Sequence, residues 1–220
     1  MKHKWIFKIL PLVCLVLLAG CLSPSALVPA APPVPTPYES YEEPEIPSNF
    51  TTYTEEGLFS ISYPSDWQPA TSIMGEIFEE TKQMMEASVP LMSLEAINIL
   101  FMAGSESLDG YYPAVTVLTE KRETGYWTLD EVYEANSRYD KAVTPGYREL
   151  SITKTVIDGR EAIIAFTEDN EPGYGRWRYL NTFTVKDDFV WLVGCSCEHQ
   201  DFRDYEETFE SVVRSLRILN

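Results

Sequence analysis

Two cysteines and a histidine near the end of the chain are the residues whose types and spacing could do chemistry. Cys195, Cys197 and His199 occur at every second position, and residues i, i+2 and i+4 of a β-strand point to the same face. Thiolate and imidazole groups bind zinc and copper, and three protein ligands plus one open position are typical of catalytic zinc sites. The spacing therefore predicts a candidate metal site, with zinc or copper as the one cofactor to consider.

Two other interpretations of the same segment stay open. Cys195 and Cys197 could be small buried side chains of the last strand, or they could form a local disulfide, which an exported protein allows but a two-residue spacing strains. The strand is expected to end near Cys197, and an end there would break the alternation before His199 is reached.

Aromatic residues provide a second candidate site, a binding surface. They lie in or beside expected loops rather than at clear core positions, and exposed aromatic residues often anchor interfaces. The alternative is that each one caps an end of the core. The residues are Tyr111, Tyr112, Tyr126, Trp127, Tyr174 and Trp177.

No arrangement of residues predicts an enzyme. Once a signal segment is removed, His199 is the one histidine left, and a nucleophile and its base usually come from distant segments rather than from Cys197 and His199. Gly173-Tyr174-Gly175 lacks the lysine and the spacing of a phosphate-binding loop. We therefore expect a protein without catalytic residues.

The N-terminus has the pattern of an export signal that ends at a cysteine. Three lysines precede an almost wholly apolar run at residues 9–18, which is shorter than the ~20 residues that a bilayer-spanning helix needs. Leu18-Ala19-Gly20-Cys21 resembles the lipobox of bacterial lipoproteins, in which the cysteine becomes the new N-terminus and carries diacylglycerol. The resemblance implies removal of residues 1–20, a membrane anchor on Cys21 and a location in the bacterial cell envelope, outside the cytoplasm.

The composition after Cys21 predicts a tether followed by a strongly acidic domain. Residues 21–49 are rich in proline, which prevents regular helix or sheet and favours a semi-extended spacer. Without residues 1–20, the chain keeps 14 basic and 34 acidic residues, a net charge of −20. Such a charge disfavours contact with nucleic acid, so the expected partners are the membrane, through the lipid, and an unidentified protein.

The remaining residues, 50–220, have the length of one globular domain. Alternating or apolar runs predict strands at 58–63, 96–103 and 114–121, and hairpins with turns at Asp158-Gly159 and Asp187-Asp188 join strands at 148–157, 161–168, 177–186 and 189–195. Helical spacing predicts helices at 71–88, from a Thr128 capping box to about residue 142, and from Phe202 to Leu216. The fold class is therefore α+β, with a central antiparallel sheet covered by helices.

Three segments of this domain resemble the PsbP-like family, which includes an extrinsic photosystem II subunit and many bacterial lipoproteins. They are the stretch from Gly57 to Trp67 that contains Tyr63-Pro64, the Asp158-Gly159-Arg160 turn, and the strand-to-helix segment from Trp191 to Ser215. The resemblance implies an α/β/α sandwich whose members bind, dock or assemble, and it transfers no functional residue. We therefore predict a tethered, non-enzymatic binding or assembly module, with metal handling by Cys195, Cys197 and His199 as the alternative.

Overall fold

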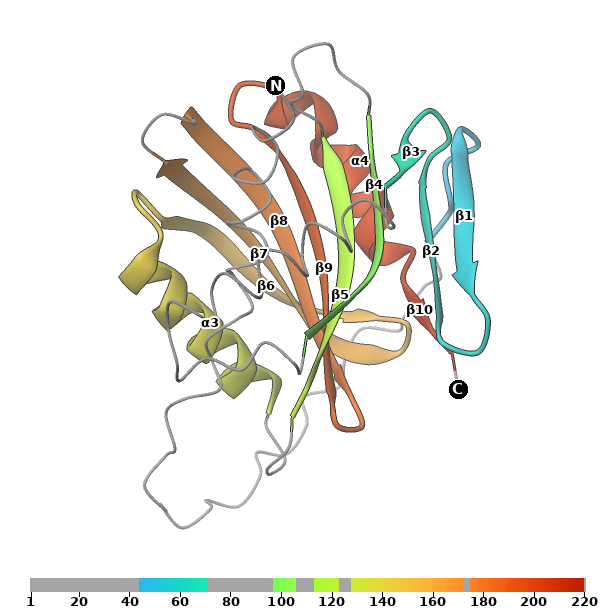
Figure 1. The fold of residues 1–220 in the computed structure, drawn as a ribbon, viewed down its shortest axis with the longest axis horizontal. Helices are drawn as coiled ribbons and strands as arrows, with labels where there is room; N and C mark the ends of the chain where they lie inside the picture. Colours follow the sequence, from blue (N-terminus) through green and yellow to red (C-terminus); the bar gives the residue numbers. More distant parts are fainter. Residues whose placement is uncertain (1–43, 71–96, 106–112, 123–127, 172–174, 220) are drawn as a thin grey trace.

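The computed structural model describes residues 44–70, 97–105, 113–122, 128–171 and 175–219. In this part of the chain, two antiparallel sheets and two helices form the fold (Figure 1). A seven-stranded sheet has the order β3-β4-β5-β9-β8-β7-β6, and a three-stranded sheet has the order β1-β2-β10. The elements are β1 (Phe50–Glu55), β2 (Phe59–Pro64), β3 (Gln68–Pro69), β4 (Ile97–Gly104), β5 (Ala114–Lys121), α3 (Leu129–Val143), β6 (Arg148–Ile157), β7 (Arg160–Glu171), β8 (Gly175–Lys186), β9 (Phe189–Glu198), α4 (Phe202–Arg214) and β10 (Arg217–Ile218).

The predominance of antiparallel sheet agrees with the predicted class, and the structure corrects several details. The short strands β3 and β10 were not predicted, and β2 pairs with β1 on one side and with β10 on the other in a separate sheet. Strand β9 continues to Glu198 rather than ending at residue 195, because Cys197 and Glu198 still pair with β8. The helix predicted at 71–88 lies outside the described residues.

Alternate residues of the central strand β9 face two separate cores. Trp191 and Val193 belong to a cluster that includes Phe209 and Val212 of α4 and Phe59 and Ile61 of β2. Val190 and Leu192 belong to a cluster that includes Val132 and Tyr133 of α3. Since side chains of a strand alternate between faces, α3 and α4 lie on opposite faces of the large sheet.

Helix α3 begins at the predicted capping box. The Thr128 hydroxyl accepts the Glu131 backbone N–H at 3.2 Å, and the Glu131 carboxylate accepts the Thr128 backbone N–H at 2.8 Å. Such reciprocal bonds satisfy two of the N–H groups that the first turn of a helix leaves without partners. The helix then extends to Val143, one residue beyond its predicted end.

Helix α4 is joined to the small sheet by one buried hydroxyl group. The Ser62 backbone N–H donates to Ser215 Oγ at 2.8 Å, beyond the two residues that pair β10 with β2. The Ser215 hydroxyl also lies 3.2 Å from the Ser62 carbonyl and 2.6 Å from the Val212 carbonyl. A side chain thus replaces a backbone partner just before the short strand β10 begins.

Replacement of Ser215 with alanine is expected to lower the free energy of unfolding by about 1–3 kcal/mol, because a buried backbone N–H loses its acceptor. Urea denaturation measures the change. The matched control is Ser211→Ala on the same helix, which removes an exposed hydroxyl that donates to the Glu207 carbonyl and should change stability by less than about 0.5 kcal/mol. Equal losses in the two variants would contradict the role of Ser215.

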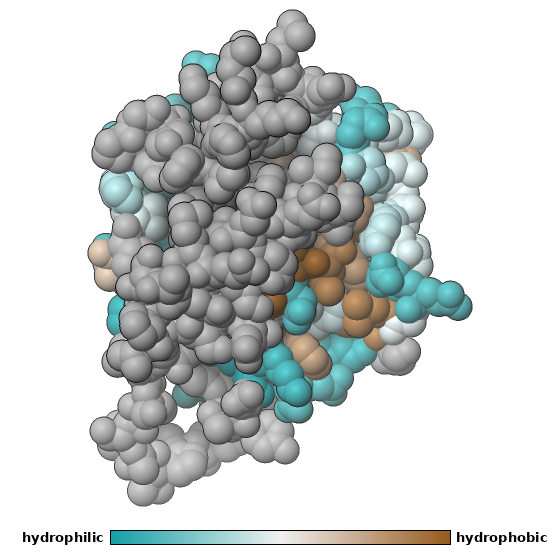
Figure 2. Space-filling model, viewed as in Figure 1, coloured by the Kyte–Doolittle hydropathy of each residue, from teal (hydrophilic) through white to brown (hydrophobic). Residues whose placement is uncertain are grey.

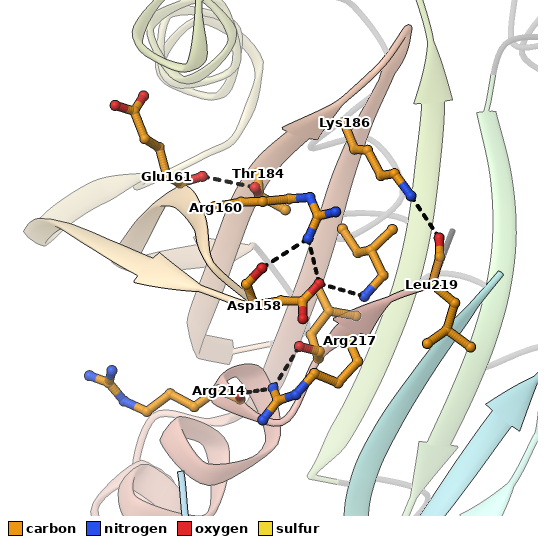
Figure 3. Close-up of polar contacts among 10 residues, drawn as sticks. Asp158, Arg160, Glu161, Thr184, Lys186, Arg214, Arg217 and Leu219 are labelled. Atoms are coloured by element: carbon orange, nitrogen blue, oxygen red, sulfur yellow. Dashed lines mark hydrogen bonds and ion pairs between the residues drawn. The ribbon is translucent and has the colours of Figure 1, made fainter. Parts of the chain in front are cut away.

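The predicted Asp158-Gly159 turn anchors the end of the chain (Figure 3). Asp158 has φ 51° and Gly159 has φ 69°, as the favoured two-residue hairpin turn requires. The Asp158 carboxylate accepts the Ile218 backbone N–H at 2.9 Å and Arg160 Nη1 at 2.6 Å. This contact fixes β10 beside the turn, and Lys186 adds a hydrogen bond to the Leu219 carbonyl at 2.6 Å.

Candidate functional site

The structure places Cys195 and Cys197 in the core as free thiols. They are 0% and 1% exposed and belong to the cluster beneath α4. Burial raises the pKa of Cys197 to about 12 and that of Cys195 well above its ordinary value. Both groups are therefore neutral thiols at pH 7, and the structure agrees with the interpretation as small core residues rather than with a disulfide.

His199 does not converge with the two thiols. Strand β9 ends at Glu198, and the His199 backbone N–H donates to the Arg176 carbonyl at 3.0 Å. The imidazole Nδ1 lies 2.9 Å from Glu168 Oε2. Across the residues that the structure describes, no group of three or more His, Cys, Asp or Glu side chains is arranged to hold a metal ion.

The partner of His199 is instead the centre of a cationic group, which we call the arginine cluster: Arg148, Arg176, Arg178 and His199 around Glu168. Glu168 Oε1 lies 2.7 Å from Arg176 Nη2 and 3.4 Å from Arg148 Nη1. Glu168 Oε2 lies 3.3 Å from Arg178 Nε, in addition to its contact with His199. Each carboxylate oxygen thus contacts two basic side chains.

The register of the large sheet assembles this cluster. Glu168 of β7 is directly opposite Arg148 of β6 on one side and Arg178 of β8 on the other. Arg176 lies two residues from Arg178 and so faces the same side of the sheet, while His199 follows the end of β9. Four segments therefore meet at one end of the sheet, on the face that α4 covers.

Electrostatics favour the ionised form of Glu168. Burial raises the pKa of Glu168, but hydrogen bonds from Arg176 and Arg178 and the charges of Arg176 and His199 lower it by more. The pKa therefore lies below its ordinary value. The side chain is 4% exposed, whereas those of Arg148 and Arg176 are 66% and 46% exposed. Glu168 therefore holds the guanidinium groups at the surface and is a poor candidate for a general base.

The Arg178 guanidinium also packs on an aromatic ring. Its central carbon lies 5.5 Å from the centre of the Phe202 ring, at the start of α4. Cation–π contact and the ion pair to Glu168 hold the side chain in one orientation. The cluster is thus preorganised on strands and a helix terminus rather than on a mobile loop.

A second polar group lies on the opposite face of the same sheet end, beneath α3. Tyr133 and Ser137 donate to Glu149 Oε1 at 2.6 and 2.7 Å, and Lys141 pairs with the other oxygen. Asp140 is 1% exposed, and its Oδ1 has no hydrogen-bond partner. Burial, with the nearby charges of Asp169 and Glu149, raises the pKa of Asp140 to about 8.

The aromatic binding surface gains no support at the one position that can be placed. Trp177 is 7% exposed and belongs to the core cluster beneath α3, so it is a core residue and not a surface anchor. Its strand, β8, begins at Gly175 rather than at residue 177. Tyr111, Tyr112, Tyr126, Trp127 and Tyr174 lie outside the described residues.

Apolar side chains do gather on one face of the molecule, over β4 (Figure 2). Ile99 and Leu100 of that strand are half-buried, and each packs against one of the two core clusters. They therefore belong to the border of the core.

Cys21 and the tether at 21–49 fall mostly outside the described residues, which begin at residue 44. Within the described part of the chain, neither helix has the length and apolar character that crossing a bilayer requires.

Reasoning from the sequence missed the arginine cluster. One signal was present: Arg176 and Arg178 flank Trp177 in a strand, an alternation that puts two cations on the face opposite a core residue. Glu168, by contrast, is one of 34 acidic residues. Nothing local distinguishes it from a solvated carboxylate.

Comparison with known proteins shows a PsbP-like fold. No protein-family model and no curated protein matches the sequence. Among solved structures, cyanobacterial PsbP (CyanoP) from Synechocystis sp. PCC 6803 matches with a TM-score of 0.51 and 11% identity over 78% of this chain and 93% of that chain. LpqN, described as involved in cell envelope biogenesis of Mycobacterium tuberculosis, matches with a TM-score of 0.50 and 11% identity over 79% and 93%. At such identity the likeness extends to the fold alone.

Proposed function

We propose that this chain is a non-enzymatic binding or assembly module of the bacterial cell envelope, held outside the cytoplasm by a lipid on Cys21. The arginine cluster is its recognition surface. The observation that carries the proposal is that three arginines and a histidine share one buried carboxylate, while Arg148 and Arg176 remain about half exposed or more. In a chain whose residues 21–220 carry a net charge of −20, such a cationic surface can attract and orient a negatively charged partner.

Binding fits the chemistry of these side chains better than catalysis does. The carboxylate of Glu168 is held by ion pairs that lower its pKa, and the thiols of Cys195 and Cys197 are buried and neutral. A nucleophile or base needs an accessible group that changes its protonation near the working pH. Arginine remains charged at any working pH and serves to bind and position anionic groups.

The fold supports the same class of function. CyanoP is named as a PsbP protein, and LpqN is described as involved in cell envelope biogenesis. An envelope location for this chain agrees with the lipobox at Cys21, with the proline-rich spacer at 21–49 and with the acidic domain that the spacer would hold away from anionic headgroups.

Affinity capture of the full chain from cross-linked membranes tests this proposal. The cluster variant Arg148→Gln with Arg176→Gln is compared with the charge-matched control Arg138→Gln with Arg203→Gln, whose side chains are exposed on α3 and α4. We expect the wild type and the control to retain the same protein, the cluster variant to lose it while staying in the membrane fraction, and Cys21→Ala to leave that fraction. Retention of the protein by the cluster variant, or membrane attachment of Cys21→Ala, would overturn the corresponding part of the proposal.

A further inference from the structure

We propose that the arginine cluster binds the phosphate group of a phosphomonoester, with the three guanidinium groups as donors. This inference rests on the proposed function, because it names the chemical class of ligand for the same surface. It covers a free phosphomonoester and the headgroup of a lipid such as phosphatidic acid, which present the same group.

The charges of the cluster match this group. Arg148, Arg176 and Arg178 carry three permanent positive charges against the single negative charge of Glu168. The excess is two charges, or three when His199 is protonated. A phosphomonoester carries about −1.5 to −2 near pH 7, so one such group neutralises the excess that Glu168 leaves.

The donors that a phosphate would need are available. Glu168 accepts hydrogen bonds from Nη2 of Arg176 and Nε of Arg178. It also forms an ion pair with Nη1 of Arg148, so it contacts one nitrogen of each guanidinium group. A guanidinium group has five N–H donors in a planar fork that matches phosphate oxygens. Glu168 carries a single negative charge, so it cannot neutralise all three guanidinium groups.

Two arginines near the Asp158-Gly159 turn show what an arginine with a structural role looks like in this protein (Figure 3). Arg217 Nη1 donates to the carbonyls of Arg214 and Leu216 at 3.0 and 2.9 Å, so it caps the end of α4. Arg160 Nη1 contacts both the carbonyl and the carboxylate of Asp158. The contacts of the arginine cluster converge on one carboxylate and include no backbone carbonyl among those described.

Two neighbouring carboxylates do not neutralise the cluster. Glu198 comes one residue after Cys197 in β9 and so faces the other side of the sheet, where it accepts from Gln200 at 3.0 Å. Asp201 stands at the start of α4, and its charge raises the pKa of Cys197. Neither one pairs with Arg148, Arg176 or Arg178 within the described salt bridges.

Thermal unfolding of the full chain in detergent tests the proposal, with inorganic phosphate as the probe and sodium chloride adjusted to keep the ionic strength constant. We expect phosphate to raise the Tm of the wild type and of the control Arg138→Gln with Arg203→Gln. The cluster variant Arg148→Gln with Arg176→Gln should need at least tenfold more phosphate for the same shift. Because Arg148 is 66% exposed, the single variant Arg148→Gln keeps the test valid should the double variant fold poorly.

Replacement of Arg176 with lysine separates fork recognition from simple charge, because lysine keeps the charge but loses the paired donors. An affinity loss in this variant supports the proposal. Equal phosphate shifts in the wild type, the cluster variant and the control would show a general ion effect and overturn it.

A vesicle arm distinguishes the two sources of the phosphate. The unanchored chain Cys21→Ala is mixed with phosphatidylcholine vesicles that contain or lack phosphatidic acid. Cluster-dependent binding to phosphatidic acid supports a lipid headgroup, and a response to inorganic phosphate without vesicle binding supports a soluble ligand. If the chain responds neither to inorganic phosphate nor to phosphatidic acid, the phosphate proposal is overturned, but the proposed function stands as long as the cluster variant still loses its protein partner. If the chain binds phosphate but the cluster variant still captures the partner, the phosphate proposal stands and the proposed function is overturned.

Discussion

Glu168→Gln is expected to lower the free energy of unfolding at pH 7 by about 2–3 kcal/mol. Removing one partner of a buried ion pair typically costs about 3–5 kcal/mol, and the solvent exposure of the arginines reduces that cost here. The amide keeps the size of the side chain, so the loss reports the charge. Urea denaturation at several pH values measures it.

The stability difference between the wild type and Glu168→Gln should depend on pH. Glu168 has a pKa below its ordinary value in the folded protein, so its stabilisation is present above the unfolded-state pKa and disappears as pH falls through the folded-state pKa. The stability difference between wild type and Glu168→Gln should therefore be full at pH 7 and shrink below about pH 4.5. A difference that stays constant down to pH 3 would contradict the ionic explanation.

Glu198→Gln is the matched control, because it is also a carboxylate at the end of the same sheet, with an exposed hydrogen bond to Gln200. The free energy of unfolding of Glu198→Gln should stay within about 0.5 kcal/mol of the wild-type value.

Phosphate should also restore part of the stability that Glu168→Gln loses, because a bound anion then replaces the missing counter-charge.

Asp140→Asn is expected to stabilise the protein by about 2–4 kcal/mol near pH 8 and to have little effect near pH 4. Burial and the nearby charges of Asp169 and Glu149 raise the pKa of Asp140 to about 8. For a raised carboxyl pKa, folding is favoured at low pH and is penalised as pH rises from the unfolded-state value to the folded-state value. Asparagine removes that penalty, since it has no charge to lose.

Denaturation of the wild type and Asp140→Asn at pH 4, 6 and 8 measures the effect. Asp130→Asn is the control on the same helix: its carboxylate is 57% exposed and pairs with Lys154, so a loss of less than about 1 kcal/mol is expected. A variant Asp140→Asn that is less stable than the wild type at pH 8 would show that the carboxylate is ionised and compensated in the folded protein.

Local sequence signals predicted the elements well where the signal lies in a few neighbouring residues. The Thr128 capping box and the Asp158-Gly159 turn act within three residues, so their geometry follows from local hydrogen bonds and backbone preferences. The strand at 114–121 also has its predicted bounds. In contrast, β10 is two residues long and exists because β2, Asp158 and Lys186 lie beside it.

At the candidate sites too, a local pattern predicted some features and tertiary contacts set the others. Cys195, Cys197 and His199 share an alternating pattern, but the imidazole follows the end of β9 and turns to Glu168. Trp177 is adjacent to an expected loop in sequence, yet it faces the core beneath α3. A periodic pattern states which residues share a face of a strand; it does not state where the strand ends or what covers that face.

The sequence by itself determined the acidic charge and the antiparallel α+β character, and it predicts an export signal that ends at Cys21 and a proline-rich spacer, because each depends on composition or on contacts within a few residues. Only the tertiary structure decided that Glu168, among 34 acidic residues, holds three arginines and a histidine. That choice depends on the register of β6, β7, β8 and β9, which brings residues up to 51 positions apart, such as Arg148 and His199, to the same carboxylate. The surroundings of the two buried carboxylates then set opposite pKa shifts. Burial and the charges of Asp169 and Glu149 raise the pKa of Asp140, whereas the basic side chains around Glu168 outweigh burial and lower its pKa.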